Sequence, residues 1–166
     1  MPRAPKPKTT KSTDEQVKSS KYVEGIGRRK TAIARVRVYP STSKPLKELL
    51  KNEDKPHLIS TEKLDFTINA KSIKKYFSFD RLIQRAIIPF SVLSIFFKTT
   101  VLVKGGGLNA QAEAISLGLS RALSDLNEKW RPRLKSFGLL TRDSRAVERK
   151  HPGLRKARRP QQWRKR

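Results

Sequence analysis

The nine residues TAIARVRVY, from Thr31 to Tyr39, alternate between two sets of side chains. One set is small or aliphatic and consists of Ala32, Ala34, Val36 and Val38. The intervening set is largely basic and consists of Ile33, Arg35, Arg37 and Tyr39. An alternation of period two predicts a β-strand with one apolar face and one basic face. Tyr22–Gly27 leads into this strand and is a candidate for an earlier short strand, and Pro40 is expected to end it.

The middle of the chain predicts two more strands with short helices between them. The strands are Leu64–Ile68 and Ile95–Val103, and the second is rich in β-branched and aromatic residues. Four residues of the second strand share one face: Phe97, Thr99, Val101 and Val103. Ser72–Phe77 and Asp80–Ile88 are predicted helices, with Asp80 as the N-cap of the second.

A longer helix is predicted after the glycines, capped by Asn109 and running to about Asn127. Its apolar residues follow steps of three and four: Ala112, Ile115, Leu119, Ala122, Leu123 and Leu126. Gly118 inside this helix costs about 1 kcal/mol relative to alanine, which suggests close packing against a sheet. In Trp130–Leu140, three apolar side chains are expected to cover the edge of the core: Leu134, Phe137 and Leu139. Strands followed by a helix indicate the α+β class.

The composition points to a strongly negative partner. The 166 residues carry 39 Lys and Arg against 14 Asp and Glu, a net charge of +25. The chain has no cysteine, which excludes disulfides and thiolate metal sites. The longest uncharged stretch, Ala86–Phe97, is shorter than the roughly 18 apolar residues that a membrane span needs. We therefore expect a soluble protein with no membrane segment, no metal, no cofactor and no small-molecule substrate.

The distribution of charge divides the chain into three parts. Residues 1–21 are basic and lack an apolar stretch, which predicts a disordered extension rather than a targeting peptide. Residues 22–141 form the predicted α+β domain, in which residues 41–62 are a long loop or insertion. Residues 142–166 hold 11 basic and two acidic side chains. They have too few apolar side chains for burial to offset the conformational entropy that is lost when the segment becomes ordered. We predict an extended tail that orders on nucleic acid, and the alternative is a flexible tail that only aids solubility.

Two segments with glycines carry the candidate phosphate contacts. Gly25–Lys30, GIGRRK, begins like a dinucleotide-binding fingerprint but lacks the third glycine and leads into a strand. Its glycines are predicted to let the backbone approach a phosphate, while Arg28, Arg29 and Lys30 supply charge. The alternative is the first strand of an ordinary hairpin with solvated cations.

The second segment, Lys104–Gly107, joins a strand to a helix, where glycine and the helix N-terminus favour an anion. A P-loop ends in Lys followed by Ser or Thr, whereas Lys104 precedes the glycines. The segment therefore suits an RNA phosphate better than a nucleoside triphosphate, and the alternative is a tight turn without a ligand. No catalytic arrangement emerges, because Asp143 and Glu148 lie among arginines that keep carboxylates ionised.

Three blocks of the chain resemble a known family: GIGRRKTAIARV (Gly25–Val36), VKGGGLNAQAEAISLGLSRAL (Val103–Leu123) and GLLTRDSRAVERKHPGLRKARRPQQWRKR (Gly138–Arg166). INAKSIKKYF (Ile68–Phe77) is a weaker match. Together they are similar to small-subunit ribosomal protein nine of the bacterial or organellar type. The resemblance implies a four-stranded sheet with helices on one face and a left-handed β-α-β crossover, like the second domain of ribosomal protein five. The N-terminal 21 residues, the long loop and Trp163-Arg164 depart from the family pattern.

The resemblance further implies a structural constituent of the small ribosomal subunit that acts in translation and is not an enzyme. Its partners would be rRNA of the subunit head, neighbouring head proteins and the anticodon stem-loop of peptidyl-site tRNA. The implied rRNA contacts are Arg28, Arg29, Lys30, Lys104, Gly105, Gly106, Gly107, Arg121, Arg142, Arg145, Arg149, Lys150, Arg155, Lys156, Arg158 and Arg159. The implied tRNA contacts are Lys165 and Arg166. The expected location is the small subunit in a bacterial cytoplasm, with an organellar ribosome as the alternative.

Two other functions stay open on the sequence alone. The first is a free nucleic-acid-packing protein outside the ribosome, which would bind any duplex with similar affinity. The second is a relative of small-molecule kinases that uses Lys104–Gly107 to hold a nucleotide.

Overall fold

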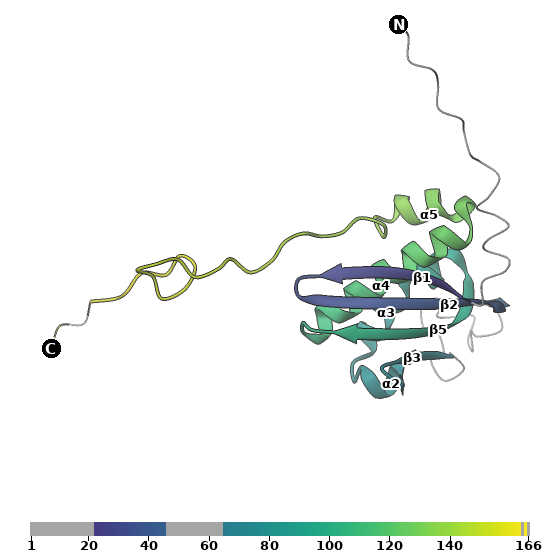
Figure 1. Ribbon diagram of the computed structural model, residues 1–166, viewed down its shortest axis with the longest axis horizontal. Helices are drawn as coiled ribbons and strands as arrows, with labels where there is room; N and C mark the ends of the chain where they lie inside the picture. The colour runs from purple at the N-terminus through teal and green to yellow at the C-terminus, as the bar shows by residue number, and fades with distance from the viewer. Residues whose placement is uncertain (1–21, 46–64, 164, 166) are drawn as a thin grey trace, which may run out of the picture.

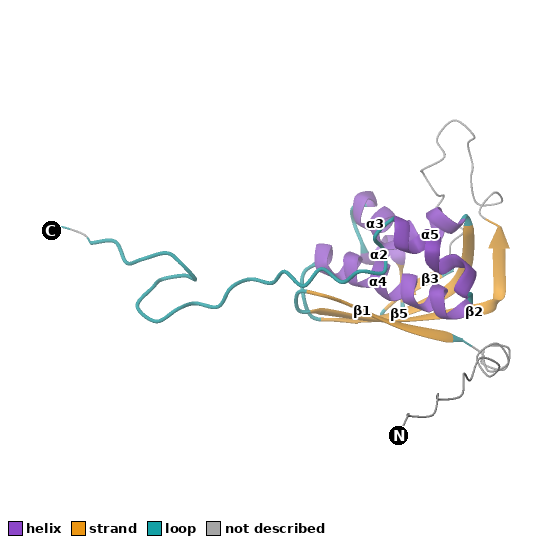
Figure 2. Ribbon diagram, turned by 90° about the horizontal axis from the view of Figure 1, so that it is seen from above, coloured by secondary structure: helices purple, strands orange, loops and turns teal. Residues whose placement is uncertain are grey.

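The computed structural model describes residues 22–45, 65–163 and 165. A five-stranded sheet forms one layer, and the helices lie together on one of its faces (Figures 1 and 2). The α+β class with helices on one face is therefore confirmed. The predicted N-terminal extension and residues 46–62 of the predicted insertion lie outside the described residues.

The sheet has the strand order β1-β2-β5-β3-β4. Antiparallel pairing joins β1 (Val23–Arg29) to β2 (Ala32–Pro45), and β2 to β5 (Ile95–Lys104). β3 (Phe66–Ile68) runs parallel to β5, and β4 (Lys71–Ser72) pairs with β3 at the far edge. The fifth strand goes beyond the four that the resemblance implied. It exists because Asn69 and Ala70, both at positive φ, form a two-residue turn after β3.

The helices connect the strands and cover the inner face. The chain passes from β3 and β4 to the parallel strand β5 through α2 (Ile73–Tyr76) and α3 (Asp80–Leu93). α4 (Leu108–Leu126) follows β5, and a 3-10 turn (Glu128–Trp130) leads into α5 (Arg131–Ser136). No helix among the described residues is long and apolar enough to cross a membrane.

The core lies between the sheet and α3 and α4. The inward set of β2 is fully buried, as predicted: Ala32, Ala34, Val36 and Val38. The predicted inner face of β5 is buried as well: Phe97, Thr99, Val101 and Val103. Burial of apolar surface contributes roughly 25 cal/mol per Å², so these two alternating faces provide a large share of the domain's stability.

Contact between α4 and the first hairpin is made at three glycines. Gly118 of α4 faces Gly25 and Gly27 of β1, and a Cβ on Gly118 would lie 2.9 Å from Cγ2 of Val36. A Cβ on Gly25 or Gly27 would overlap the α4 backbone at Gly118 or Ala114. The predicted close approach of this helix to the sheet is confirmed.

The strand that begins at Ala32 does not end at Pro40, contrary to the prediction. β2 continues to Pro45, and its register against β5 shifts between Tyr39 and Lys44. A bulge leaves residues unpaired, so the missing N–H of proline costs no ladder hydrogen bond there.

The predicted helix starts were each one or two residues off. Phe79 is the N-cap of α3 and Asp80 is its first helical residue, with no side-chain cap hydrogen bond. Gly107, in an extended conformation, is the N-cap of α4 in place of Asn109. α3 also continues past Ile88 to Leu93, because Pro89, Phe90 and Leu93 are buried in the core.

Of the side chains expected to cover the edge of the core, Leu134 is fully buried and Leu139 packs partly against it. Phe137 does not contribute, since it is 63% exposed. α5 ends at Ser136, so the helical spacing that would have turned Phe137 inward stops before it.

Candidate nucleic-acid interface

The two glycine-containing segments singled out in the sequence meet at one end of the sheet. Lys30 and Thr31 form the turn between β1 and β2, with Lys30 at a φ of 50°. A Cβ on Gly105 would lie 2.6 Å from the Thr31 carbonyl oxygen, so the turn after β5 lies directly beside it. We call this surface, Arg28–Thr31 and Lys104–Gly107, the turn end.

The glycines of the turn after β5 have a conformational role. Gly105 and Gly106 have φ values of 71° and 69°, a region that side chains other than glycine rarely adopt. A Cβ on Gly106 would also lie 2.7 Å from Cβ of Ala32. Gly107, the third glycine of the run, has a negative φ of −94°. The turn requires glycine with or without a ligand.

Three cations project from the turn end without a carboxylate partner among the described residues: Arg28, Lys30 and Lys104. All three side chains are exposed. The first amides of α4 lie beside them, and α4 has no side-chain cap. Exposed cations next to uncapped helix amides favour an anion, and a backbone phosphate has the matching chemistry.

Gly25 and Gly27 do not serve the role predicted for them. The space in front of their α-carbons is filled by the backbone of α4, so no phosphate can approach there. These glycines permit helix packing, a requirement that the sequence around them does not reveal.

Arg29 and Arg121 are already engaged within the protein. The Arg29 side chain is only 13% exposed, and its Nε lies 2.6 Å from Oε2 of Glu113. Arg121 donates from Nη1 to the Ile26 carbonyl at 2.7 Å, at the outer edge of β1. Arg121 retains further N–H donors for a partner, whereas the Arg29 guanidinium is occupied.

The outer face of the sheet extends from the turn end. Exposed Ile26, Ile33 and Leu102 lie on neighbouring strands, and a hollow of about 270 Å³ is lined by Ile33, Arg35, Leu102 and Lys104. The sequence placed Arg35 and Ile33 on this face through the alternation in β2. It did not show that three aliphatic side chains from three strands would gather there.

The basic charge of this outer face is partly neutralised by Glu24. Arg35 and Arg37 donate from their Nε atoms to the Glu24 carboxylate at 2.8 and 2.9 Å. Hydrogen bonds from Arg35, which has the larger effect, and from Arg37 lower the pKa of Glu24 below its ordinary value. The hydrogen bond to Glu24 in turn raises the pKa of Arg37. These arginines are therefore less available to a phosphate than the cations of the turn end.

The basic segment after Thr141 leaves the domain beside the turn end (Figures 1 and 2). Residues 142–163 contain no helix or strand. Seven residues of this segment that are predicted to contact rRNA are exposed: Arg142, Arg145, Arg149, Lys150, Arg155, Lys156 and Arg159. Arg158 is exposed as well and pairs with Glu148 at 2.7 Å. Lys165 is exposed, and Arg166 lies outside the described residues.

At the root of this segment, Asp143 holds Arg145. The Arg145 side chain and backbone N–H both donate to the Asp143 carboxylate. These bonds, the side-chain bond most of all, hold the pKa of Asp143 far below its usual range. The same interaction raises the pKa of the Arg145 guanidinium. No group of three or more His, Asp or Glu side chains that could hold a metal ion occurs in the part of the chain that the structure describes.

Comparison with known proteins decides the family. Residues 27–166 match the family model described as ribosomal protein S9/S16. This chain belongs to the ribosomal protein S9/S16 family. The matched range contains both segments of the turn end and the whole basic tail.

Individual relatives agree with this membership. The small ribosomal subunit protein uS9 of Mycoplasmopsis synoviae (strain 53) is 41% identical over 145 residues, which is 86% of this chain and 95% of the relative. The protein of the same name from Amoebophilus asiaticus (strain 5a2) is 38% identical over 87% of this chain and 98% of its own length. The form uS9c of Spinacia oleracea is 42% identical over 89% of this chain and 62% of its own length.

Membership gives this S9-family protein a structural rather than an enzymatic role. The kinase-like interpretation of Lys104–Gly107 is therefore wrong. Two of the glycines that suggested it, Gly105 and Gly106, are explained by their positive φ values and by their contacts with Thr31 and Ala32.

Proposed function

We propose that this chain is a constituent of the small ribosomal subunit that binds rRNA of the subunit head through the turn end and the basic tail. Neighbouring head proteins complete its surroundings. The observation that carries the proposal is the position of three exposed cations next to the root of the tail: Arg28, Lys30 and Lys104, which have no carboxylate partner in the described part of the chain. From Arg149 onward the tail adds nine basic and no acidic side chains.

The contacts in this proposal are made to phosphate rather than to base edges. The turn end offers cations and backbone amides but no aromatic side chain on which a base could stack. Arginine in the tail suits phosphate because its planar guanidinium donates two parallel hydrogen bonds. Affinity should therefore depend steeply on salt and little on sequence.

The end of the tail is assigned to tRNA in the peptidyl site. Support comes from the family resemblance of the last block and from the charges of Lys165 and Arg166. Trp163 is 83% exposed and offers a face for stacking nearby. In this proposal Lys165 and Arg166 lie against the backbone of the anticodon stem-loop.

We place this small subunit in a bacterial cytoplasm rather than in an organelle. The relatives include two bacterial proteins and one chloroplast form. Fractionation of cells, followed by sedimentation of ribosomes from each compartment, tests the assignment.

The test of rRNA binding compares two triple variants of the full chain. One replaces Arg28, Lys30 and Lys104 with glutamine, and the other replaces Lys129, Arg133 and Lys135, which are exposed on the 3-10 turn and α5, away from the turn end (Figure 1). The affinity for a head-domain rRNA fragment is measured against salt concentration. Each lost phosphate contact lowers the slope of log affinity against log salt by about 0.9. The first variant should therefore lose about 2.7 of the slope and the control should keep it.

Equal slopes for the two variants would overturn the assignment of the turn end. The packing-protein alternative is tested in the same assay with an unrelated RNA duplex as competitor. If the duplex competes as well as the head-domain fragment, the chain is a general nucleic-acid binder.

A further inference from the structure

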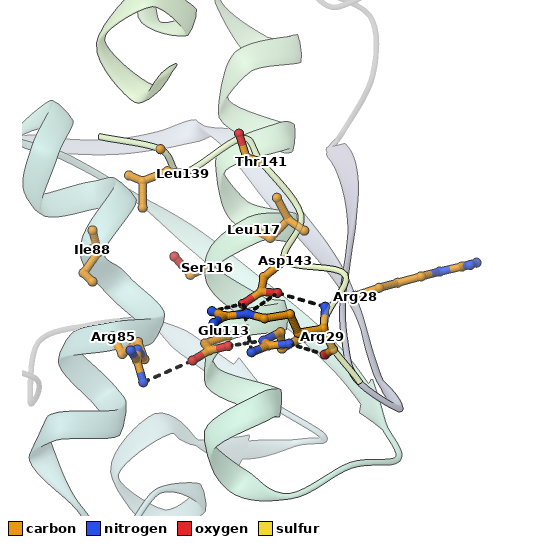
Figure 3. Close-up of a pocket in the computed structure, with 12 residues that line it drawn as sticks. Arg28, Arg29, Arg85, Ile88, Glu113, Ser116, Leu117, Leu139, Thr141 and Asp143 are labelled. Carbon is orange, nitrogen blue, oxygen red and sulfur yellow. Dashed lines mark hydrogen bonds and ion pairs between the residues drawn. The ribbon is translucent and has the colours of Figure 1, made fainter. Parts of the chain in front are cut away.

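One guanidinium joins three separate parts of the chain beside the turn end. Arg29, the last residue of β1, contacts Glu113 of α4 at 2.6 Å through Nε and Asp143 of the tail at 3.0 Å through Nη2. Its Nη1 donates to the Arg145 carbonyl at 2.7 Å. Figure 3 shows the side chains of Arg29, Glu113 and Asp143 converging, while Arg28, the residue before Arg29, points away from them. We call Arg29, Glu113, Asp143 and Arg145 the Arg29 clamp.

The groups around Arg29 are held in place on both sides. Glu113 also pairs with Arg85 of α3 at 3.2 Å, which ties the helix layer to the clamp. Asp143 accepts hydrogen bonds from the backbone N–H of Arg145 at 2.9 Å and from its Nη2 at 2.7 Å. The root of the tail is thus a closed turn attached to a largely buried cation.

The clamp is the last polar attachment of the tail to the domain. Among residues 146–163, every hydrogen bond and ion pair is made within the tail, as between Arg158 and Glu148. The direction in which the tail leaves the domain is therefore fixed at Asp143–Arg145, and Arg29 is the residue on the domain that holds it.

We propose that Arg29 is a positioning residue for the tail rather than a phosphate contact. Its planar fork of N–H donors serves a carboxylate on α4 and two acceptors on the tail root together, which fixes the starting direction of the tail. A tail with a fixed start loses less conformational entropy when it binds, so the clamp preorganises it. The benefit of this preorganisation for RNA binding rests on the proposed function, whereas the geometry of the Arg29 clamp does not.

The chain has no cysteine, so pairs of introduced cysteines give unambiguous positions for spin labels. One pair joins the domain to the tail, at Lys129 and at Val147, which is 88% exposed and lies two residues beyond the clamp. A second pair, at Lys71 and Lys129, lies within the domain and reports on its folding. Distance distributions are measured on the full, free protein by pulsed electron spin resonance.

Two substitutions disrupt the clamp: Arg29→Gln on the domain and Asp143→Asn on the tail. Arg28→Gln is the matched control for Arg29→Gln, because both remove one positive charge. We expect the parent and Arg28→Gln to give one narrow distance peak between domain and tail. Arg29→Gln and Asp143→Asn should lose that peak and give a broad distribution, while the pair within the domain stays unchanged. A narrow, unshifted peak in both clamp variants overturns the proposal, as does a broad distribution in the parent.

Binding to the head-domain rRNA fragment separates positioning from phosphate contact. Arg28→Gln should lower the slope of log affinity against log salt by about 0.9, and Arg29→Gln should lower affinity without changing the slope. If Arg29→Gln lowers the slope as much as Arg28→Gln, Arg29 is a phosphate contact and the proposal fails. If no variant binds rRNA while the spin-label result holds, the proposed function fails and the clamp stands.

Discussion

Gly118 of α4 and Gly27 of β1 face each other with no side chain between them, and a Cβ on Gly118 would lie 3.0 Å from the backbone nitrogen of Gly27. Through this contact α4 lies directly on the hairpin whose turn carries Arg28 and Lys30. The position of the turn end relative to the start of α4 therefore depends on the absence of a side chain at both Gly27 and Gly118.

Gly27→Ala should destabilise the protein by about 3 kcal/mol, the upper end of the range for overpacking, since the added methyl group overlaps the α4 backbone at Ala114. Gly118→Ala should cost less, because alanine recovers about 1 kcal/mol of helix propensity. Urea unfolding measures both. Gly107→Ala is the control, with open space around its α-carbon and a negative φ. A Gly27→Ala protein as stable as the control would refute the packing account.

Gly106→Val should be poorly tolerated for reasons of conformation. Its φ of 69° strains any side chain, at a cost of about 1–3 kcal/mol, and the new side chain would collide with Ala32. We expect reduced incorporation into small subunits when the variant competes with the parent, together with a lower unfolding temperature. Incorporation equal to that of the parent would show that the turn tolerates another conformation.

The Glu24 pairs should contribute up to about 1 kcal/mol at neutral pH, as exposed ion pairs do. The folded-state pKa of Glu24 is lowered, so this stability is present above the unfolded pKa and is lost as pH falls through the folded value. The free energy of unfolding of Glu24→Gln should therefore fall below that of the parent at pH 7. The two curves should converge as the pH falls below the ordinary pKa of a glutamate side chain and Glu24 becomes protonated. A constant difference at all pH values would mean that the lost contacts are not ionic.

Much of the sheet could be predicted from the sequence, because alternation along β2 and β5 directly reports which side chains are buried. The turn end could be predicted only as two separate segments, since nothing local indicates that Thr31 lies against Gly105. The sequence alone does not separate Arg29 from Arg28 and Lys30, because all three are cations in one run. Arg29's partners Glu113 and Asp143 are far away in sequence, and only the fold distinguishes it.

Removal of Lys165 and Arg166 should leave the domain and subunit assembly intact, because Lys165 is exposed and the tail makes its last polar contact with the domain at Arg145. Affinity for peptidyl-site tRNA should fall by up to about 1 kcal/mol per lost contact, similarly for all tRNAs because phosphate carries no sequence information. Binding of several tRNAs to purified subunits measures this. Unchanged affinity at low salt would make the tail an rRNA anchor only.

The most direct test of the turn end as an rRNA interface is directed hydroxyl-radical cleavage in reconstituted small subunits. Single cysteines at Lys30, Lys104 and Lys129 each carry an iron chelate, which the cysteine-free parent cannot bind at another site. Positions 30 and 104 are predicted to cleave one shared region of head rRNA strongly, and position 129 to cleave it weakly or not at all. Strong cleavage from position 129 with none from 30 and 104 would contradict the account.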